Sequence, residues 1–199
     1  MFIPNIDQYN IVLASQSPRR QYLLKEIGLH FELKGKEVID ESYPDYLVKE
    51  QIPLYIAQKK ASAFTNELKE RDLLIADTIV WLDGKVLQKP VDQDDAIGIL
   101  NQISGKCHQV YTGVCLKTTH KETTFSACTD VYFKKLTSQE VEYYIQHYKP
   151  LDKAGAYGIQ EWIGYIGVEK INGSFFNVMG LPIQKLYTVL NYFINHKNT

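Results

Sequence analysis

The segment LASQSPRR, residues 13–20, carries the first group of side chains that could bind an anion. It follows a predicted strand and places Arg19 and Arg20 in the first turn of a predicted helix. Cations at that end oppose the helix dipole, at about 0.3 to 1 kcal/mol each when exposed. A bound anion would make the two arginines stabilising at this position. Backbone N–H groups, Ser15, Ser17 and both guanidinium groups would then converge on the anion. The alternative, two solvated arginines on a surface helix, is slightly favoured by local physics.

Two acidic segments could supply metal ligands or a general base. In LLIADTIV, residues 73–80, Asp77 directly follows four apolar residues. Burying an unpaired carboxylate costs several kcal/mol, so we expect Asp77 at a strand end, facing a cleft and paired with a cation or metal. A structural aspartate that caps a neighbouring loop fits equally well. The Asp40–Ser42 segment, DES, would complete a magnesium site, which takes one or two carboxylates plus phosphate oxygens and waters. Solvated loop acids are the alternative there.

Two lysines and a glycine-containing segment offer further polar groups. Lys60 lies in IAQKKASAF and Lys89 in LQKP, and exposure at the surface is the default expectation for both. The small residues of LDKAGAYGIQ, residues 151–160, allow the backbone to approach a ligand closely. Lys153 and Gln160 would add hydrogen bonds there, although a tightly packed loop and helix is the alternative. The segment is neither a P-loop nor a dinucleotide fingerprint.

The remaining catalytic candidates carry less weight. His108 follows a helix-ending glycine, and we expect it to be a structural, hydrogen-bonding histidine. A serine hydrolase with Ser15 or Ser17 as nucleophile has little support, because GxSxG is absent. Two acidic segments, two arginines at a helix start and two lysines together suit metal-assisted chemistry on a polyphosphate. No single motif establishes that chemistry.

The elements that must position these residues alternate between strand-like and helix-like stretches, which predicts an α/β chain without repeats or a linker. Strands are predicted at residues 11–14, 30–33, 72–82, 108–119, 123–135 and 163–171. Helices are predicted at residues 18–28, 53–68, 92–104, 137–148 and 182–193. Asp83-Gly84 is a hairpin signal, Asp92 is the expected N-cap of the helix that follows, and Thr137 with Glu140 forms a capping box.

Composition narrows the class of protein further. The chain has 199 residues, 45% of them apolar, and a net charge of −1 from 22 basic and 23 acidic side chains. A chain of this length buries roughly 70% of its unfolded surface, so one domain, or one with two lobes, needs no disulfide or zinc. The near-zero charge argues against nucleic acid as a partner.

Localisation signals are absent from the sequence. Apolar runs reach only four residues, so we expect no membrane span, and the first residues do not resemble a secretory signal. Cys107, Cys115 and Cys128 lack zinc-site spacing, and we expect reduced thiols on strands. These features predict a cytoplasmic protein.

The order of the motifs along the chain is recognisable. The matching segments are LASQSPRR (13–20), DE (40–41), AQKKA (57–61), ADTIV (76–80), QKP (88–90), SGKCHQVYTGV (104–114), DKAGAYGIQ (152–160) and INGSFFNVMGLPI (171–183). In this order they closely resemble the Maf family of nucleoside triphosphate pyrophosphatases, once described as septum-formation inhibitors. The resemblance spans nearly the whole chain.

The resemblance implies a fold and a reaction. The fold would be α/β and related to the inosine-triphosphate pyrophosphatases: an elongated, curved mixed sheet with flanking helices, and two lobes around a central cleft. Residues 1–199 would form one such domain without a separable linker. The reaction would be hydrolysis between the α- and β-phosphates of a nucleoside triphosphate, with Mg²⁺ or Mn²⁺, giving the monophosphate and pyrophosphate.

The resemblance also carries roles onto individual residues. The catalytic aspartate would be Asp77, and the metal-side carboxylates Glu41 and Asp77, with Asp40 left open as an alternative to Glu41. Substrate phosphates would be bound by Ser15, Arg20, Lys60 and Lys89. Preference for dTTP and UTP would depend on Arg19, Thr78 and Gln160. The following stretch, EWIGYIGVEK, is about one residue longer than is common, and its Trp162 is unusual.

A second interpretation is a non-catalytic, nucleotide-binding regulator of septum formation. The carboxylates favour an enzyme, because they repel a triphosphate unless a metal intervenes. Cleaning the nucleotide pool and arresting cell division are both compatible roles for that enzyme. The expected partner is a nucleoside triphosphate, and a homodimer is left open.

Overall fold

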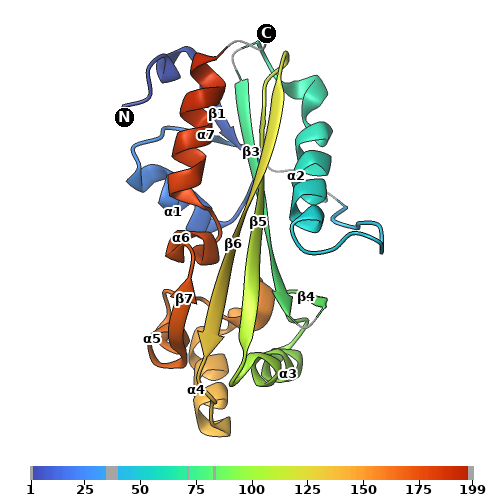
Figure 1. The fold of residues 1–199 in the computed structure, drawn as a ribbon, viewed down its shortest axis with the longest axis vertical. Helices are drawn as coiled ribbons and strands as arrows, with labels where there is room; N and C mark the ends of the chain where they lie inside the picture. The colour runs from blue at the N-terminus through green and yellow to red at the C-terminus, as the bar shows by residue number, and fades with distance from the viewer. Residues whose placement is uncertain (1, 35–39, 71, 83, 197–199) are drawn as a thin grey trace. The chain divides into compact units, whose positions relative to one another are not determined.

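The computed structural model describes residues 2–34, 40–70, 72–82 and 84–196, with their side chains except at 73–80. Seven strands form one mixed sheet in the order β2-β1-β3-β5-β6-β7, with β4 paired to β3 (Figure 1). Strand β1 pairs in parallel with β2 and β3, whereas β3–β4 and β6–β7 are antiparallel. A mixed α/β sheet with flanking helices, as predicted, is confirmed.

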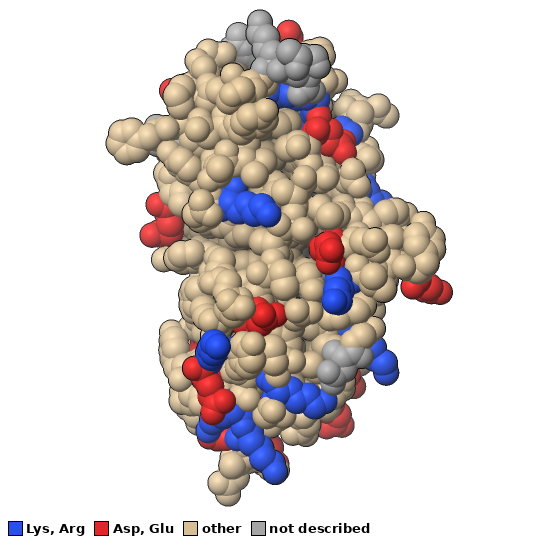
Figure 2. All heavy atoms as spheres, viewed as in Figure 1, with Lys and Arg blue, Asp and Glu red and all other residues tan. Residues whose placement is uncertain are grey.

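The chain divides into two compact units, described separately below. The first consists of Met1–Thr78, Thr112–Ala127 and Gly180–Thr199, and the second of Ile79–Tyr111 and Cys128–Met179. Three strands contribute residues to both: β3 (Asp72–Leu82), β5 (Cys107–Lys117) and β6 (Glu122–Phe133). Acidic and basic side chains are interspersed on the face shown in Figure 2, in keeping with the net charge of −1.

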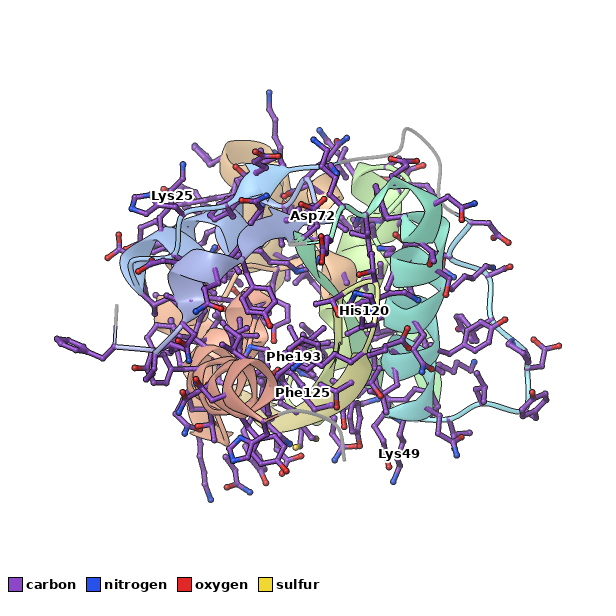
Figure 3. The ribbon with its side chains drawn as sticks, turned by 90° about the horizontal axis from the view of Figure 1, so that it is seen from above. Lys25, Lys49, Asp72, His120, Phe125 and Phe193 are labelled. Atoms are coloured by element: carbon purple, nitrogen blue, oxygen red, sulfur yellow. The ribbon has the colours of Figure 1, made fainter. Side chains whose placement is uncertain are left out.

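The first unit places helices on both faces of its strands. Its own elements are η1 (Ile6–Gln8), β1 (Asn10–Leu13), α1 (Pro18–Glu26), β2 (Glu32–Leu33), α2 (Gln51–Ala63), η2 (Thr65–Glu67) and α7 (Ile183–Asn195). Helices α1 and α7 lie on one side of the strands and α2 on the other (Figure 3). Figure 3 also labels Asp72, a buried carboxylate at the start of β3 that accepts hydrogen bonds from the Lys34 ammonium at 3.3 Å and the Lys69 N–H at 3.2 Å.

Helix α2 packs directly on the sheet. The buried cluster beneath it consists of Val12, Ala14, Ala57, Ala61, Phe64 and Cys115. At Gly113 the two backbones touch, because an added Cβ would lie 2.3 Å from the carbonyl carbon of Pro53. Small residues at the contact therefore set how closely α2 approaches β5.

The second unit contains the remaining helices. Its own elements are β4 (Lys85–Leu87), α3 (Gln93–Ile103), α4 (Ser138–Tyr148), η3 (Pro150–Asp152), η4 (Ala154–Ala156), α5 (Trp162–Gly167), β7 (Val168–Asn172) and α6 (Phe175–Met179). The predicted capping box of Thr137 and Glu140 starts α4, and the Asp92 carboxylate caps α3 at Asp95 N–H, 2.8 Å away. The predicted hairpin is confirmed by pairing of Leu82 with Lys85, although Asp83 lies outside the described residues.

Three predicted elements differ from the structure. The strand predicted over residues 163–171 is wrong: residues 162–167 form helix α5, and β7 begins only at Val168. Periodicity cannot separate helix from strand in so short an apolar run. Helix α2 begins at Gln51 and ends at Ala63, before a separate 3₁₀ turn, and β2 has only two residues.

The helices are short. The two longest among the described residues, α2 and α7, have 13 residues each. In the part of the chain that the structure describes, no helix is long and apolar enough to cross a membrane.

All three cysteines lie on strands as thiols, as predicted. Cys107 and Cys115 belong to β5, and Cys128 belongs to β6. Cys107 and Cys128 are exposed, whereas Cys115 is buried beneath α2. Burial raises the pKa of the Cys115 thiol to about 12.

Candidate active site

The junction between β1 and α1 fixes the first group of predicted site residues. Ser15 Oγ accepts hydrogen bonds from Arg20 Nη1 at 2.8 Å and from the Ser17 N–H at 3.2 Å. A hydroxyl has two acceptor sites and one donor, so these bonds leave the Ser15 proton for another acceptor. Ser17 occupies the N-cap and Pro18 the first turn, as predicted, but the Ser17 side chain makes no capping bond.

Arg20 is buried and held in place. Its Nε donates to the carbonyl oxygen of Gly180 at 3.0 Å, and the residue is only 9% exposed. Gly180 has φ +127°, a conformation that favours glycine, at the turn that leads into α7. The guanidinium is therefore positioned by α1 and by the segment before α7, and neighbouring Arg19 is half-buried on α1.

Lys60 and Glu41 form the second group. Lys60 Nζ lies 2.6 Å from Glu41 Oε1, with 11% of the lysine side chain exposed and 55% of the glutamate. The expectation of a surface lysine is wrong here, because Lys60 lies on the inner face of α2 with the fully buried Ala57 and Ala61. Small alanines leave room for the lysine stem while the ammonium reaches outward.

Asp40, beside Glu41, has a different set of partners. Its carboxylate accepts the Ser42 N–H at 2.9 Å, the Ser42 hydroxyl at 2.7 Å and the Lys59 ammonium at 2.7 Å. Lys59 also donates to the Ser42 carbonyl oxygen at 3.0 Å. The Lys59 and Ser42 hydrogen bonds lower the pKa of Asp40 well below its ordinary value. Both oxygens of Asp40 are therefore engaged, by its own loop and by Lys59 of α2, whereas Glu41 pairs with Lys60 of the same helix.

The Glu41 carboxylate could supply part of a metal site at this loop. Among the described residues there is no group of three or more His, Cys, Asp or Glu side chains able to hold one. The half-exposed Glu41 carboxylate supplies the hard oxygen donors that Mg²⁺ prefers, and magnesium sites commonly combine one or two carboxylates with phosphate oxygens and waters. The donor present fits such a site. The side chains of Asp77 and Thr78 lie outside the described residues, so only their places in β3 are described.

The second unit holds the other predicted residues. Lys89 follows β4 and is exposed, as expected. The preceding residue, Gln88, accepts the Gly155 N–H at 3.2 Å through its carbonyl oxygen. This bond places the Lys89 segment beside the predicted glycine-containing segment. Gly155 has φ +73° and Ala156 φ +56°, so the backbone there is tightly turned.

Gln160 ends this segment with an unusual side chain. Its Oε1 is buried and has no hydrogen-bond partner among the described residues. Its backbone carbonyl oxygen accepts the Tyr165 hydroxyl at 2.6 Å. The backbone carbonyl is thus held in place, while the buried amide oxygen lacks a donor among the described residues.

A buried network beside Gln160 was not predicted from the sequence. Glu161 lies 3.2 Å from the Lys153 ammonium through Oε1 and accepts the Tyr144 hydroxyl at Oε2. Tyr144 oxygen in turn accepts the Gly158 N–H at 3.0 Å. In the sequence, Tyr144 lies at helical spacing with Val141 and Tyr148, a pattern that indicates only an apolar helix face. Gly158, three residues before Glu161, was the one local signal of a close approach.

His108 is structural, as expected. It is 1% exposed, and its Nε2 lies 2.7 Å from the Tyr157 hydroxyl. Burial lowers the pKa of His108 to about 4. The imidazole is therefore neutral at pH 7 and is not a proton donor for catalysis there.

The chain matches a known protein family over most of its length. The model of the Maf-like protein family matches residues 10–193. The chain belongs to this family. It is 56% identical over 189 residues to the dTTP/UTP pyrophosphatases of Phocaeicola vulgatus and of Bacteroides fragilis, covering 94% of this chain and 98% of each relative.

A solved structure gives a weaker likeness. The nucleoside-triphosphatase, or dITP/XTP pyrophosphatase, of Mycobacterium abscessus aligns with 65% of this Maf-like protein and 76% of that chain. The TM-score is 0.39 and the sequence identity 15%.

The structure of this Maf-like protein brings predicted site residues together within each unit. In the first unit Ser15 contacts Arg20 and Lys60 contacts Glu41. In the second, Gln88 connects the Lys89 segment to the segment that ends at Gln160. Each unit therefore holds predicted site residues of its own: two separate pairs in the first, and in the second a backbone hydrogen bond between the Lys89 segment and the segment that ends at Gln160.

Proposed function

We propose that this Maf-like protein hydrolyses the bond between the α- and β-phosphates of dTTP and UTP. The products are the nucleoside monophosphate and pyrophosphate. The observation that carries the proposal is the pair of Lys60 and Glu41, a buried cation that holds a half-exposed carboxylate at 2.6 Å. A triphosphate with a divalent cation needs both charges at one place. Relatives at 56% identity bear the name dTTP/UTP pyrophosphatase, which supports the substrate class.

Phosphate oxygens are bound by Ser15, Arg20, Lys60 and Lys89. Ser15 offers the proton that its two accepted hydrogen bonds leave over. Arg20 is already fixed by Gly180 and Ser15, so little side-chain entropy is lost on binding. These cations neutralise the charge that shifts onto the leaving pyrophosphate.

Glu41 and Asp77 hold the divalent cation, Mg²⁺ or Mn²⁺. When bound, the cation lowers the pKa of water and neutralises phosphate charge. Glu41 is proposed in preference to Asp40 because both oxygens of Asp40 are engaged by Ser42 and Lys59. Asp77 orients a water toward the α-phosphorus and accepts its proton.

Base preference is assigned to Gln160, with Arg19 and Thr78 adding donors. Uracil and thymine present an N–H flanked by two carbonyl oxygens. The buried, unpartnered Gln160 Oε1 is suited to accept that N–H, and the amide N–H₂ to donate to a carbonyl. Cytosine has no such N–H, so it leaves the amide oxygen unsatisfied, at about 1 to 3 kcal/mol.

The decisive experiment is product analysis in a single turnover with dTTP and Mg²⁺. The proposal expects thymidine monophosphate and pyrophosphate. Formation of diphosphate and inorganic phosphate would place the cleavage at the wrong bond. Nucleotide binding without turnover would favour the regulator of septum formation over the enzyme.

Other predictions concern where the protein acts and with what. We expect a cytoplasmic protein whose partner is the triphosphate rather than nucleic acid or a membrane. The acidic and basic side chains interspersed on the face shown in Figure 2 support the expectation that nucleic acid is not a partner. Homodimer formation and a role in clearing nucleotide pools or arresting division stay predictions.

A further inference from the structure

Glu161 connects the start, the middle and the end of the segment from Lys153 to Gln160. One carboxylate oxygen faces Lys153 Nζ at 3.2 Å, and the other accepts the Tyr144 hydroxyl. Tyr144 then accepts the Gly158 N–H at 3.0 Å. Since Glu161 directly follows Gln160, this single side chain closes the segment into a loop.

The carboxylate also lies close to the loop at Gly158. A Cβ on Gly158 would lie 2.7 Å from the Glu161 carboxyl carbon, so a larger residue there would force the carboxylate to move. Lys153 and Tyr144 are buried, and the Glu161 side chain is only 20% exposed. Ion pairs and hydrogen bonds are stronger away from water, so this network is a rigid support rather than a solvated surface pair.

The loop from Lys153 to Gln160 has an unfavourable backbone conformation that this network can stabilise. Gly155 and Ala156 both have positive φ, and for Ala156 that conformation is unfavourable by itself. The loop ends at Gln160, whose backbone carbonyl is held by Tyr165 and whose buried Oε1 has no partner in the described part of the chain. A shift of the loop would therefore move that amide oxygen directly.

We propose that Glu161, together with Lys153 and Tyr144, is a positioning residue for base selectivity that holds the Gln160 amide where it reads the pyrimidine. This inference rests on the proposed function. Glu161 itself touches no substrate. Its removal leaves the bond-breaking groups intact and loosens the discrimination between bases.

The test measures kcat/KM for UTP and for CTP in the same preparations. In Glu161→Ala we expect the UTP-to-CTP ratio of kcat/KM to fall about tenfold, mainly through a higher KM for UTP. Glu161→Gln keeps the shape and an acceptor for Tyr144, so it should restore part of the ratio. Glu142→Ala removes an exposed glutamate of the same unit and should leave the ratio unchanged.

A double-mutant cycle separates positioning from stability. In a Gln160→Ala background, Glu161→Ala should change the ratio no further, because the group it positions is gone. A lower melting temperature with an equal loss toward both nucleotides would make Glu161 merely structural and overturn the inference. If Glu161→Ala does not fold, Tyr144→Phe, which removes one hydroxyl, gives the same test.

The outcome for the wild type keeps the two proposals apart. A wild-type protein that cleaves neither nucleotide would end the proposed function. A wild type that prefers UTP, with an unchanged ratio in both Glu161→Gln and Glu161→Ala, would end only the role of Glu161.

Discussion

Two acidic sites, Asp40–Glu41 in the first unit and Glu161 in the second, use their charges differently. The Asp40 and Glu41 side chains are 68% and 55% exposed, and each pairs with a lysine of α2. Glu161 is mostly buried and pairs with a lysine and a tyrosine that are more buried still. Exposed ion pairs contribute about 0 to 1 kcal/mol, whereas breaking a buried pair costs several.

This difference in exposure separates carboxylates that can bind a ligand from those that stabilise the fold. A carboxylate that water already reaches can exchange its partner for a cation or a phosphate-bound metal at little cost. A buried network cannot exchange its partners in this way, because the exchange would leave a charged side chain buried without a partner. We therefore expect substitutions in the first group to change turnover more than stability, and those in the second to change stability or selectivity.

The largest effect is expected at Asp77, the proposed base. Asp77→Asn should lower kcat by about 100-fold or more and leave the fold intact, because the swap keeps the shape and removes the charge. Steady-state kinetics and circular dichroism test this, with Asp45→Asn as an exposed control in the same unit. Near-normal turnover by a folded Asp77→Asn protein would rule out Asp77 as the base.

Lys153 should have the largest effect on stability. Lys153→Met leaves Glu161 without its cation, and we expect a loss of about 3 kcal/mol, at the low end for a buried pair because Glu161 is one-fifth exposed. Urea unfolding measures it, with exposed Lys85→Met as the control. An unchanged midpoint would mean that the network is no stronger than the surface pairs.

The buried His108 should make the stability of the folded protein depend on pH. Its pKa of about 4 in the folded protein lies below the ordinary 6.5, so the unfolded state binds more protons between those values. Stability should therefore fall as the pH drops, by about 2 kcal/mol between pH 7 and pH 5. His108→Gln should lose this part of the pH dependence when unfolding is followed at both pH values. An identical pH dependence in the variant would mean that protonation of His108 does not reduce the stability of the folded protein.

Removal of a single phosphate-binding cation should have a smaller effect. Arg20→Ala and Lys89→Ala should each lower kcat/KM for dTTP about tenfold, the equivalent of one charge-assisted hydrogen bond of roughly 1.5 kcal/mol. Arg20→Lys separates loss of charge from loss of the contacts with Ser15 and Gly180. Full activity and unchanged affinity in both alanine variants would rule out the phosphate-binding role.

The smallest effect is expected at Asp40. Asp40→Asn retains an acceptor for Ser42 and loses only an exposed pair with Lys59, so kcat/KM should change less than threefold. Glu41→Gln, the matched variant one residue on, should lose tenfold or more. Equal losses in the two variants would reverse the choice of Glu41 over Asp40.

The features that could be predicted from the sequence are those that depend on local patterns of residues. Caps at Asp92 and Thr137 and the hairpin after Leu82 were predicted, since each depends on residues a few positions apart. The contact of Ser15 with Arg20 was also within reach, because a strand end and a helix start bring neighbours together.

What the sequence could not predict depends on contacts between distant segments. Lys60 is buried because α2 packs its alanine-lined face onto the sheet. Helical spacing from Ala57 places Lys60, and not Lys59, on that face, but a charged side chain is expected at the surface unless the packing of its stem is known. The bond from Tyr144 to Glu161 joins two helices through a hydroxyl that periodicity counts as apolar. Helix α5 was missed because its apolar run is too short to show a period.

The distribution of the three thiols provides a way to observe one unit alone. Cys115 lies under α2 with a pKa of about 12, so almost none of it is thiolate near pH 8. Cys107 and Cys128 are exposed, and both belong to the second unit. A maleimide dye added to the unmodified protein should therefore label that unit and leave the first unlabelled. Fluorescence from such a probe would report events in the unit that contains the Gln160 loop without any engineered cysteine.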